Sequence, residues 1–267
     1  MKITTWNINS VRLRIEQVVK FLATEAPDVL CLQEIKCLED NFPGKALAEA
    51  GYEHQAVSGQ AGYHGVAIVS KLPLSKIEKR EFCQKGDCRH IAASVPGGIR
   101  VHNFYVPAGG DEADPVKNEK FAHKLDFLDE MTGWFSELGP RSKSVLVGDL
   151  NVAPHEHDVW SHKQLLKVVS HTPIEVEKLG EVIDSHGWVD VAREITPETE
   201  KLYSWWSYRA KDWRASNRGR RLDHIWVSPA LKKAATAGGR DAYKIHDDAR
   251  GWERPSDHAP VSLTLSL

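Results

Sequence analysis

Short runs of apolar residues, some alternating with polar ones, recur along the chain and predict β-strands. Such runs lie at residues 3–9, 28–34, 64–70, 90–95, 100–106, 144–151, 221–228 and 259–265. Apolar residues at helical spacing predict helices over 10–24, with Ser10 as the N-cap, over 115–138, beginning at Pro115, and over 161–169 and 173–186. Because helices separate some strands while other strands follow one another directly, the order indicates a mixed α/β fold. The sequence has no fixed-period repeat and no linker rich in Pro, Gly or Ser, so we expect one domain spanning residues 1–267.

Polar side chains end several of these strands. In SVLVGDLN, residues 144–151, the side chains of Val145, Val147, Asp149 and Asn151 should share one face, since neighbours along a strand alternate. A carboxylate thus continues a face that should be buried, and burying an unpaired carboxylate is costly. The strand therefore suggests that Asp149 has a partner.

The same arrangement recurs elsewhere along the chain. Further polar residues at or beside strand ends are Asn7, Asn9, Glu34, Tyr105, Asp223, Asp257 and His258. Glu34, for example, should share a strand face with Leu30 and Leu32. A single Asp or Asn there is usually a turn residue, but the ends of strands in a packed α/β sheet meet at one rim, where active sites gather. These oxygen-rich side chains favour Mg²⁺ or Mn²⁺ over Zn²⁺ and predict metal-assisted phosphoester hydrolysis.

Composition and charge restrict the setting. The chain has 267 residues, of which 41% are hydrophobic and 27% charged, with a formal net charge of -2, as in an ordinary soluble globular protein. Any affinity for nucleic acid must therefore come from a local patch. No run of about 18 apolar residues predicts a membrane span, and the N-terminus lacks a signal-peptide core, so we expect a cytoplasmic protein that does not bind membranes.

Two sets of Cys and His residues could be parts of further metal sites. Cys83 and Cys88 precede His90, and His155 and His157 have the spacing of a ligand pair. Neither set has the additional ligands in the nearby sequence that would complete a site. We therefore interpret the four cysteines as reduced thiols and the segment around His155 as a loop.

One segment, residues 203–221, combines basic and aromatic side chains. Its members are Trp205, Trp206, Tyr208, Arg209, Lys211, Trp213, Arg214, Arg218, Arg220 and Arg221. Basic side chains contact phosphates, and aromatic rings stack on bases or wedge into a disrupted step. Alternatively, 203–208 is an aromatic core strand, and for Trp206 and Tyr208 the two interpretations stay open. For the loop 209–220 we favour contact with DNA.

At the polar strand-end residues and in the segment 203–221, the sequence resembles the exonuclease III family of apurinic/apyrimidinic endonucleases, within the endonuclease/exonuclease/phosphatase superfamily. The matching segments are WNINSVR, LCLQEIK, YHGVAIVSK, NFYVPAG, VLVGDLNVAP, YSWWSYR, RLDHIWVS and PSDHAPV. They follow one another over nearly the whole chain. The resemblance implies a four-layer α/β sandwich like that of deoxyribonuclease I, in which two packed mixed β-sheets are flanked by helices.

The resemblance also implies roles for the matching positions. At the metal it places Asn7, Glu34, Asp149, Asn151, Asp257 and His258. As catalytic residues it places Tyr105, Asp149, Asn151, Asp223 and His258. Asp223 would orient His258, and the resemblance leaves open whether Asp149 or His258 is the general base. For DNA binding it implies, together with the basic segment, Asn9, Arg12, Lys36, His64, Arg89, Trp205, Arg209, Asn217 and Arg218.

The activity implied is Mg²⁺-dependent hydrolysis, with Mn²⁺ able to substitute, of the phosphodiester 5′ to abasic sites in duplex DNA. Exonuclease activity in the 3′→5′ direction and removal of blocking groups from 3′ ends are implied with it. We expect a monomer that associates with the nucleoid through its substrate. One alternative is a phosphatase or phosphodiesterase of the same superfamily acting on a small phosphoester, which would not need the segment 203–221. A second is a non-catalytic DNA-binding module.

Overall fold

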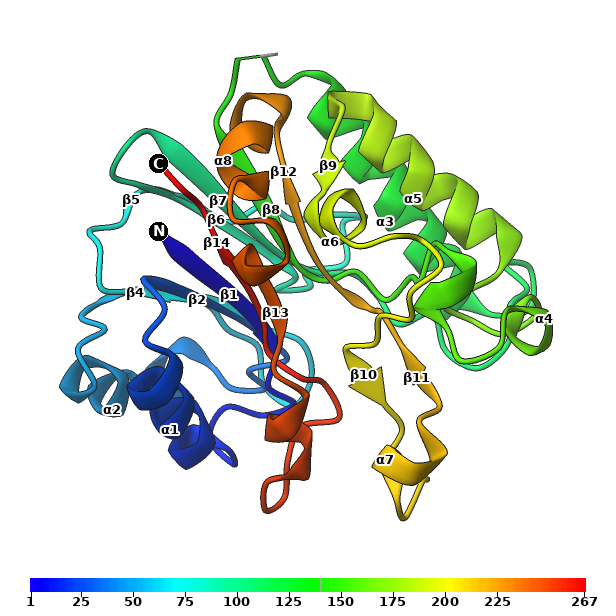
Figure 1. Cartoon of the computed structure of the whole chain (residues 1–267), viewed down its shortest axis with the longest axis horizontal. Helices are drawn as coiled ribbons and strands as arrows, with labels where there is room; N and C mark the ends of the chain where they lie inside the picture. The colour runs from blue at the N-terminus through cyan, green and yellow to red at the C-terminus, as the bar shows by residue number, and fades with distance from the viewer. Residues whose placement is uncertain (140) are drawn as a thin grey trace.

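The computed structural model describes residues 1–139 and 141–267. Within them, two six-stranded mixed sheets pack face to face (Figure 1). The first consists, in spatial order, of β13 (Tyr243–Ile245), β14 (Val261–Thr264), β1 (Lys2–Asn7), β2 (Val29–Gln33), β4 (Val66–Ser70) and β3 (His54–Ser58). The second consists of β5 (Ser75–Glu78), β6 (His90–Val95), β7 (Ile99–Tyr105), β8 (Ser144–Asp149), β12 (Asp223–Val227) and β9 (Val189–Asp190). Each sheet contains one parallel pair, β1 with β2 and β7 with β8, and its other neighbours are antiparallel.

Helices cover the outer face of each sheet, which completes four layers (Figure 1). The helices α1 (Ile15–Glu25) and α2 (Gly44–Glu49) pack on the first sheet, and α3 (Glu119–Ser136) and α5 (Pro173–His186) lie against the second. Short helices occur in the connections: α4 (His162–Leu165), α6 (Val191–Ile195), α7 (Trp213–Ser216) and α8 (Lys232–Thr236). The two-stranded hairpin of β10 (Trp205–Trp206) and β11 (Gly219–Arg220), which carries α7, projects from the body (Figure 1). The predicted four-layer α/β sandwich is thus confirmed.

The predicted elements are recovered to different degrees. Each of the eight predicted strands is present, and α5 has the predicted bounds. Pro173 occupies its first turn, Thr172 and Glu175 form a capping box, and Gly187 ends it with a φ of 66°. These local signals are complete, so the helix could be delimited from sequence.

Two predicted helix starts are wrong. Ser10 has a φ of 84° and lies in the loop before α1, which begins only at Ile15. The helix predicted from Pro115 begins at Glu119, where the side chain of Asn118 accepts a hydrogen bond from the backbone N–H of Lys120. The helix predicted over 161–169 is shorter, at His162–Leu165.

The apolar core between the sheets contains a polar bridge, formed by Thr5, Gln33 and Asn103. Gln33 Nε2 donates hydrogen bonds to Asn103 Oδ1 at 2.6 Å and to Thr5 Oγ1 at 2.8 Å. Asn103 Nδ2 donates across the interface to the carbonyl oxygens of Leu32 at 3.0 Å and Ala67 at 2.9 Å. Since Gln33 directly precedes Glu34 and Asn103 lies two residues before Tyr105, the polar bridge fixes the relative position of the sheets beside the candidate site.

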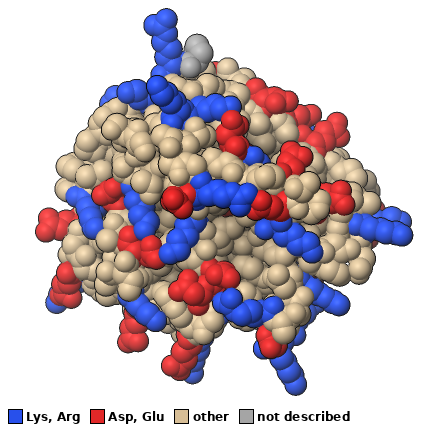
Figure 2. Space-filling model, viewed as in Figure 1, with Lys and Arg blue, Asp and Glu red and all other residues tan. Residues whose placement is uncertain are grey.

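The surface carries both signs of charge. On the face seen in Figure 2, Lys and Arg are interspersed with Asp and Glu, in keeping with a net charge of -2. No helix in the described residues is long and apolar enough to cross a membrane.

Candidate active site

The carboxyl ends of the two parallel strand pairs meet at one rim. Asn7 ends β1, Glu34 follows β2, Tyr105 ends β7 and Asp149 ends β8. Glu34, Tyr105 and Asp149 line a cleft of about 900 Å³ that also includes Asn151, Asp257 and His258. The structure therefore brings together the polar strand-end residues from both sheets.

Glu34 lies at the centre of the contacts between the sheets. One of its oxygens, Oε1, accepts hydrogen bonds from Asn7 Nδ2 at 2.9 Å and from the Tyr105 hydroxyl at 2.8 Å. Its other oxygen pairs with Lys36 Nζ at 2.8 Å. The predicted face shared with Leu30 and Leu32 is wrong, because the φ of Glu34 is 49° and this turn directs the side chain toward the second sheet.

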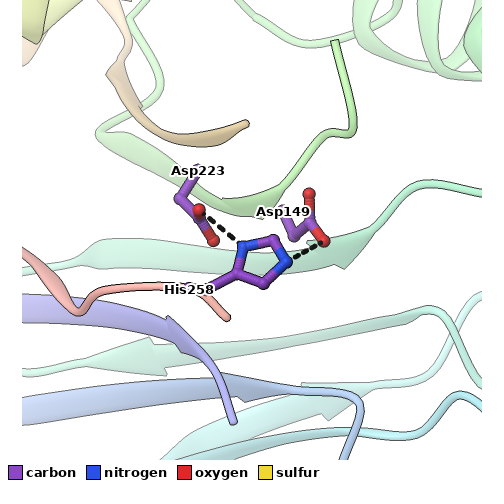
Figure 3. A group of neighbouring side chains, drawn as sticks. All are labelled: Asp149, Asp223 and His258. Carbon is purple, nitrogen blue, oxygen red and sulfur yellow. Dashed lines mark hydrogen bonds and ion pairs between the residues drawn. The ribbon is translucent and has the colours of Figure 1, made fainter. Parts of the chain in front are cut away.

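His258 lies between two buried carboxylates (Figure 3). Its Nδ1 is 2.8 Å from Asp223 Oδ2, and its Nε2 is 3.6 Å from Asp149 Oδ2. Asp149 and Asp223 are paired across the neighbouring strands β8 and β12. Asp223 is held in turn by the Ser204 hydroxyl, which donates to Oδ2 at 2.6 Å.

Asp149 is not isolated, which explains how a carboxylate can continue the face of Val145 and Val147. Its Oδ2 accepts a hydrogen bond from Asn7 Nδ2 at 2.9 Å, and its Oδ1 accepts one from the backbone N–H of Asn151 at 3.0 Å. Asn151 has a φ of 53°, and its side-chain Nδ2 donates to the carbonyl oxygen of Val106 at 2.9 Å.

Burial and neighbouring charges shift the pKa values of these groups. Burial raises the pKa of Asp149 to about 7, and the charges of Asp223 and Glu34 add to this effect, although His258 opposes it. Burial alone would lower the pKa of His258, but the carboxylates of Asp223 and Asp149 outweigh it and raise the pKa to about 10. At neutral pH the imidazole is therefore a cation.

Glu34 and Tyr105 are shifted in ways that keep Glu34 charged and Tyr105 neutral. Burial would raise the pKa of Glu34, but Lys36 and the hydrogen bond from Asn7 lower it below its usual value. Burial, the charge of Glu34 and that of Asp149 raise the pKa of Tyr105 well above its usual value. Tyr105 is thus a hydrogen-bond donor to Glu34.

The donor set at the cleft fits a divalent cation that prefers oxygen ligands. Ligand atoms of Asp149, Asp223 and His258 lie within 4.8 Å of one another, and the two carboxylates can bind a cation while His258 stays protonated beside them. Glu34 and Asp257 add carboxylates to the same cleft. Burial, with smaller contributions from Asp223 and Glu34, raises the pKa of Asp149, and a bound cation would offset this effect.

Asn7 and Asp257 already have protein partners. The amide nitrogen of Asn7 bridges Glu34 and Asp149, and its oxygen accepts the N–H of Asn9 at 3.1 Å. Asp257 accepts hydrogen bonds from Asn9 Nδ2 at 3.2 Å and from Trp205 Nε1 at 2.9 Å. Their assignment as metal ligands stays a prediction.

In the described ranges 1–139 and 141–267, Asp149, Asp223 and His258 are the one cluster of three such groups. His155 lies 3.7 Å from Glu198 and belongs to no cluster of this kind. The four cysteines are free thiols.

The match to the Endonuclease/Exonuclease/phosphatase family covers residues 4–258. The chain belongs to this family. The exodeoxyribonuclease III of Haemophilus influenzae is 32% identical to it over 98% of both chains. The DNA repair nuclease APEX1 of Danio rerio is 34% identical over 100% of this chain and 83% of its own length.

Solved structures agree with this membership of the endonuclease/exonuclease/phosphatase family. The 3′ phosphatase NExo from Neisseria, solved bound to a product DNA hairpin, superposes with a TM-score of 0.90 at 34% identity, covering 100% of both chains. An AP endonuclease from Archaeoglobus fulgidus superposes with a TM-score of 0.91 at 31% identity, also covering 100% of both chains. The chain is accordingly a nuclease of this family with the deoxyribonuclease I-like fold.

The hairpin β10–β11 forms one wall of the cleft of this family member. Trp205, Arg209 and Arg218 line the cleft, and the guanidinium of Arg218 lies 4.7 Å from the centre of the Trp160 ring. Asn217 is exposed, with a φ of 42°, and its side-chain oxygen accepts a hydrogen bond from Trp206 Nε1 at 3.0 Å. Of the two residues for which a core strand over 203–208 stayed open, Trp206 is buried and Tyr208 is exposed, and the strand itself covers only Trp205–Trp206.

The predicted DNA contacts outside the hairpin, which do not line the cleft, have different surroundings. Arg12 is exposed, and the ring of His64 lies 6.4 Å from that of Tyr105. Lys36 pairs with Glu34 and donates to Asn9 Oδ1 at 2.6 Å. Arg89 is buried, pairs with Asp87 at 2.7 Å and packs over the Tyr105 ring, so in this structure it supports Tyr105. Its contact with DNA stays a prediction.

Sequence reasoning missed part of the cleft wall. Trp160 and the segment 168–170 line the cleft, and Arg220, which was noted only as part of the basic segment, packs over Trp205 at 5.2 Å. Trp160 lies just before α4, and residues 168–170 lie between α4 and α5, where the sequence predicts the end of a helix and no site. Only the aromatic character of Trp160 could have suggested it.

Proposed function

We propose that this protein is a Mg²⁺-dependent DNA repair nuclease that hydrolyses the phosphodiester 5′ to abasic sites in duplex DNA. We include in the proposal 3′→5′ exonuclease activity and the removal of blocking groups from 3′ ends. The observation that carries it is the pair of Asp149 and His258 in a cleft lined by residues of a basic and aromatic hairpin, with Asp223 buried behind His258. The names of the relatives, exodeoxyribonuclease III, DNA repair nuclease and AP endonuclease, support the same activity.

Glu34, Asp149 and Asp257 would hold the metal, with Asn7, Asn151 and His258 beside it. When bound, Mg²⁺ supplies Lewis-acid polarisation of a phosphoryl oxygen, and Mn²⁺ has the same ligand preference. Tyr105 would orient Glu34 through the hydrogen bond between them.

Asp149 would be the general base that accepts a proton from the attacking water. A pKa raised toward neutrality suits this role, and the N–H of Asn151 and the amide of Asn7 hold the carboxylate in place. His258, charged at neutral pH, would instead stabilise the negative charge that grows on the phosphate, with Asn151. This assignment favours Asp149 over His258 as the base, since an imidazolium has no lone pair to accept a proton.

The hairpin would bind the DNA. Exposed Arg209 and Arg218 can contact phosphates, and Trp205, which is partly exposed in the cleft, can lie against an extruded abasic sugar. An abasic nucleotide is cheaper to flip out of the duplex than an intact one, which favours it as the substrate. A small phosphoester would make no use of this wall. We further propose that the protein acts as a monomer in the cytoplasm and reaches the nucleoid through its substrate.

The test is cleavage of an end-labelled duplex carrying one abasic-site analogue, with Mg²⁺ and with excess EDTA. The expected product is a nick immediately 5′ of the lesion, lost with EDTA and with Glu34→Ala. Asp149→Asn should lower kcat by about 10²–10⁴-fold, the usual contribution of a positioned general base. A wild-type protein that binds this duplex and never nicks it would contradict the proposal, and small phosphoesters would then be the substrates to examine.

A further inference from the structure

A fully buried ion pair lies directly behind the active site. Lys124 on α3 and Glu175 on α5 are both completely excluded from solvent, and the Lys124 ammonium donates a hydrogen bond to Glu175 Oε1. Neither residue lines the cleft. Their contacts, however, lead to it.

Lys124 holds the backbone on two sides of the cleft floor. Its Nζ donates to the carbonyl oxygen of Asn151 at 2.7 Å and more weakly to that of Ala108 at 3.4 Å. Asn151 follows β8 and Ala108 follows β7, so one ammonium links the segments after both parallel strands. Asn151 is itself part of the site. Its backbone N–H donates to Asp149, and its side-chain amide donates to the Val106 carbonyl oxygen.

Glu175 holds the cleft wall from the other side. Both of its oxygens accept the backbone N–H of Ser170 at 2.9 Å, and Oε2 also accepts the hydroxyl of Thr172 at 2.6 Å. The carbonyl oxygen of Ser170 accepts the N–H of Ala153 at 2.7 Å, which links this wall back to the segment containing Asn151.

The two backbone positions that the pair contacts, Asn151 and Ser170, both have a left-handed φ. Asn151 has a φ of 53° and Ser170 a φ of 87°, and neither is glycine. Asn adopts such a conformation more readily than other non-glycine residues, whereas Ser rarely does, so Ser170 in particular depends on its surroundings. Lys124 bonds the Asn151 carbonyl oxygen and Glu175 bonds the Ser170 N–H, and these contacts keep the backbone of both residues in place.

We propose that Lys124 and Glu175 are positioning residues, which hold Asn151 in its catalytic orientation through its carbonyl oxygen. The inference rests on the proposed function in that it takes Asn151 to act on the phosphate. A buried ion pair is weak evidence for stability, because apolar replacements of similar volume are often neutral or stabilising. The hydrogen bonds of this pair to the backbone of Asn151 and Ser170, beside the site, assign it a role in the reaction.

A second ion pair between the same two helices provides a matched control. Lys178 on α5 pairs with Asp129 on α3, and both side chains are partly exposed and lie away from the cleft. Lys178→Met/Asp129→Asn therefore removes an α3–α5 ion pair without touching the segments at the site.

The experiment compares Lys124→Met/Glu175→Gln with this control in the abasic-site cleavage assay. We expect kcat to fall by about 10- to 100-fold, as for a misplaced catalytic group, with KM nearly unchanged. The thermal unfolding temperature should fall as well, because buried carbonyl oxygens lose their donor, so kcat is compared at a temperature at which the variant is folded. The control should keep the wild-type kcat. Lys124→Gln/Glu175→Gln, which keeps a neutral hydrogen-bonding pair with a shorter donor arm, serves the same test if the first variant does not fold.

A double-mutant cycle separates positioning from a general loss of structure. In an Asn151→Ala background, Lys124→Met/Glu175→Gln should change kcat little, because the group that it positions is absent. Equal fold losses in both backgrounds would overturn the inference. So would a crystal structure of the variant in which Asn151 keeps its φ and its bond to Val106, and this readout does not depend on activity. A wild-type protein without nuclease activity would instead contradict the proposed function.

Discussion

His258 shows how single residues set the chemistry of the site. Its Nδ1 faces Asp223 at 2.8 Å and its Nε2 faces Asp149, so carboxylates on both sides stabilise its positive charge. The pKa of His258 is raised in the folded protein to about 10, above its ordinary value near 6.5. The resulting stabilisation is complete below about pH 6.5 and is lost as the pH rises through about 10. His258 is therefore charged at the pH of the reaction.

Asp223→Asn tests this arrangement. The neutral amide cannot balance the imidazolium, so the pKa of His258 should fall toward its ordinary value and kcat should drop by about 10²-fold, as when one preorganised charge-stabilising group is lost. The pKa is followed by NMR titration of the imidazole in EDTA, and kcat by abasic-site cleavage.

Ser204→Ala is the matched control, since it removes the hydroxyl that supports Asp223 but leaves the carboxylate. It should lower the pKa of His258 less than Asp223→Asn does. An unchanged pKa in Asp223→Asn would show that Asp223 does not hold the charge of His258.

Among the elements, the hairpin β10–β11 has the clearest separate task. It projects from the body (Figure 1). Its Arg209 and Arg218 are exposed and line the cleft. Each phosphate contact contributes about 0.9 to the slope of log affinity against log salt concentration. Arg209→Gln/Arg218→Gln should therefore reduce that slope by about 1–2 and raise KM, while kcat at saturating DNA changes little. Affinity is measured by fluorescence anisotropy over a salt series.

A variant with the same loss of charge elsewhere tests whether the position matters. Lys45 on α2 is 91% exposed, and Lys76 lies on the exposed edge strand β5. Lys45→Gln/Lys76→Gln should keep the wild-type slope. If both double variants changed the slope equally, the hairpin would have no specific role in binding DNA.

The elements also show where sequence is sufficient. The helix α5 could be delimited because Thr172, Pro173, Glu175 and Gly187 each satisfy a local requirement of its ends. The hairpin could not, because β10 and β11 have two residues each and depend on contacts with distant segments, such as the bond from Trp206 N–H to the Asp257 carbonyl at 3.0 Å. Ser10 was misread for a related reason, since the chain there turns to meet residues 34 and 35 before α1 begins.

At the scale of the whole molecule, the site exists only where the two sheets meet. Sequence identified Asn7, Glu34, Tyr105 and Asp149 because each stands at the end of an apolar strand. It could not predict their mutual contacts, because the alternation along one strand says nothing about the alignment of two sheets. The positive φ of Glu34, which directs it at Tyr105, has no signal in its residue type either.

The polar bridge of Thr5, Gln33 and Asn103 gives the last prediction. Asn103→Leu would leave the carbonyl oxygens of Leu32 and Ala67 without their bonds across the interface and would remove the 2.6 Å contact with Gln33. Unpaired buried polar groups cost about 1–3 kcal/mol each, so the free energy of unfolding should fall by about 2–4 kcal/mol. Because Glu34 and Tyr105 are one and two residues from the bridge, their hydrogen bond should loosen and kcat should fall as well.

Thr4→Val provides the comparison, since Thr4 bonds Ser262 at 2.7 Å within the first sheet and does not cross to the second. It should cost about 1 kcal/mol of stability in urea unfolding and leave kcat unchanged. Comparing the two variants separates the loss of stability from a loss of alignment between the two sheets. If Asn103→Leu lost stability but kept its kcat, the sheets would hold their relative position without the bridge. A loss of kcat confined to Asn103→Leu would mean that the bridge between the sheets, and not packing alone, places Glu34 against Tyr105.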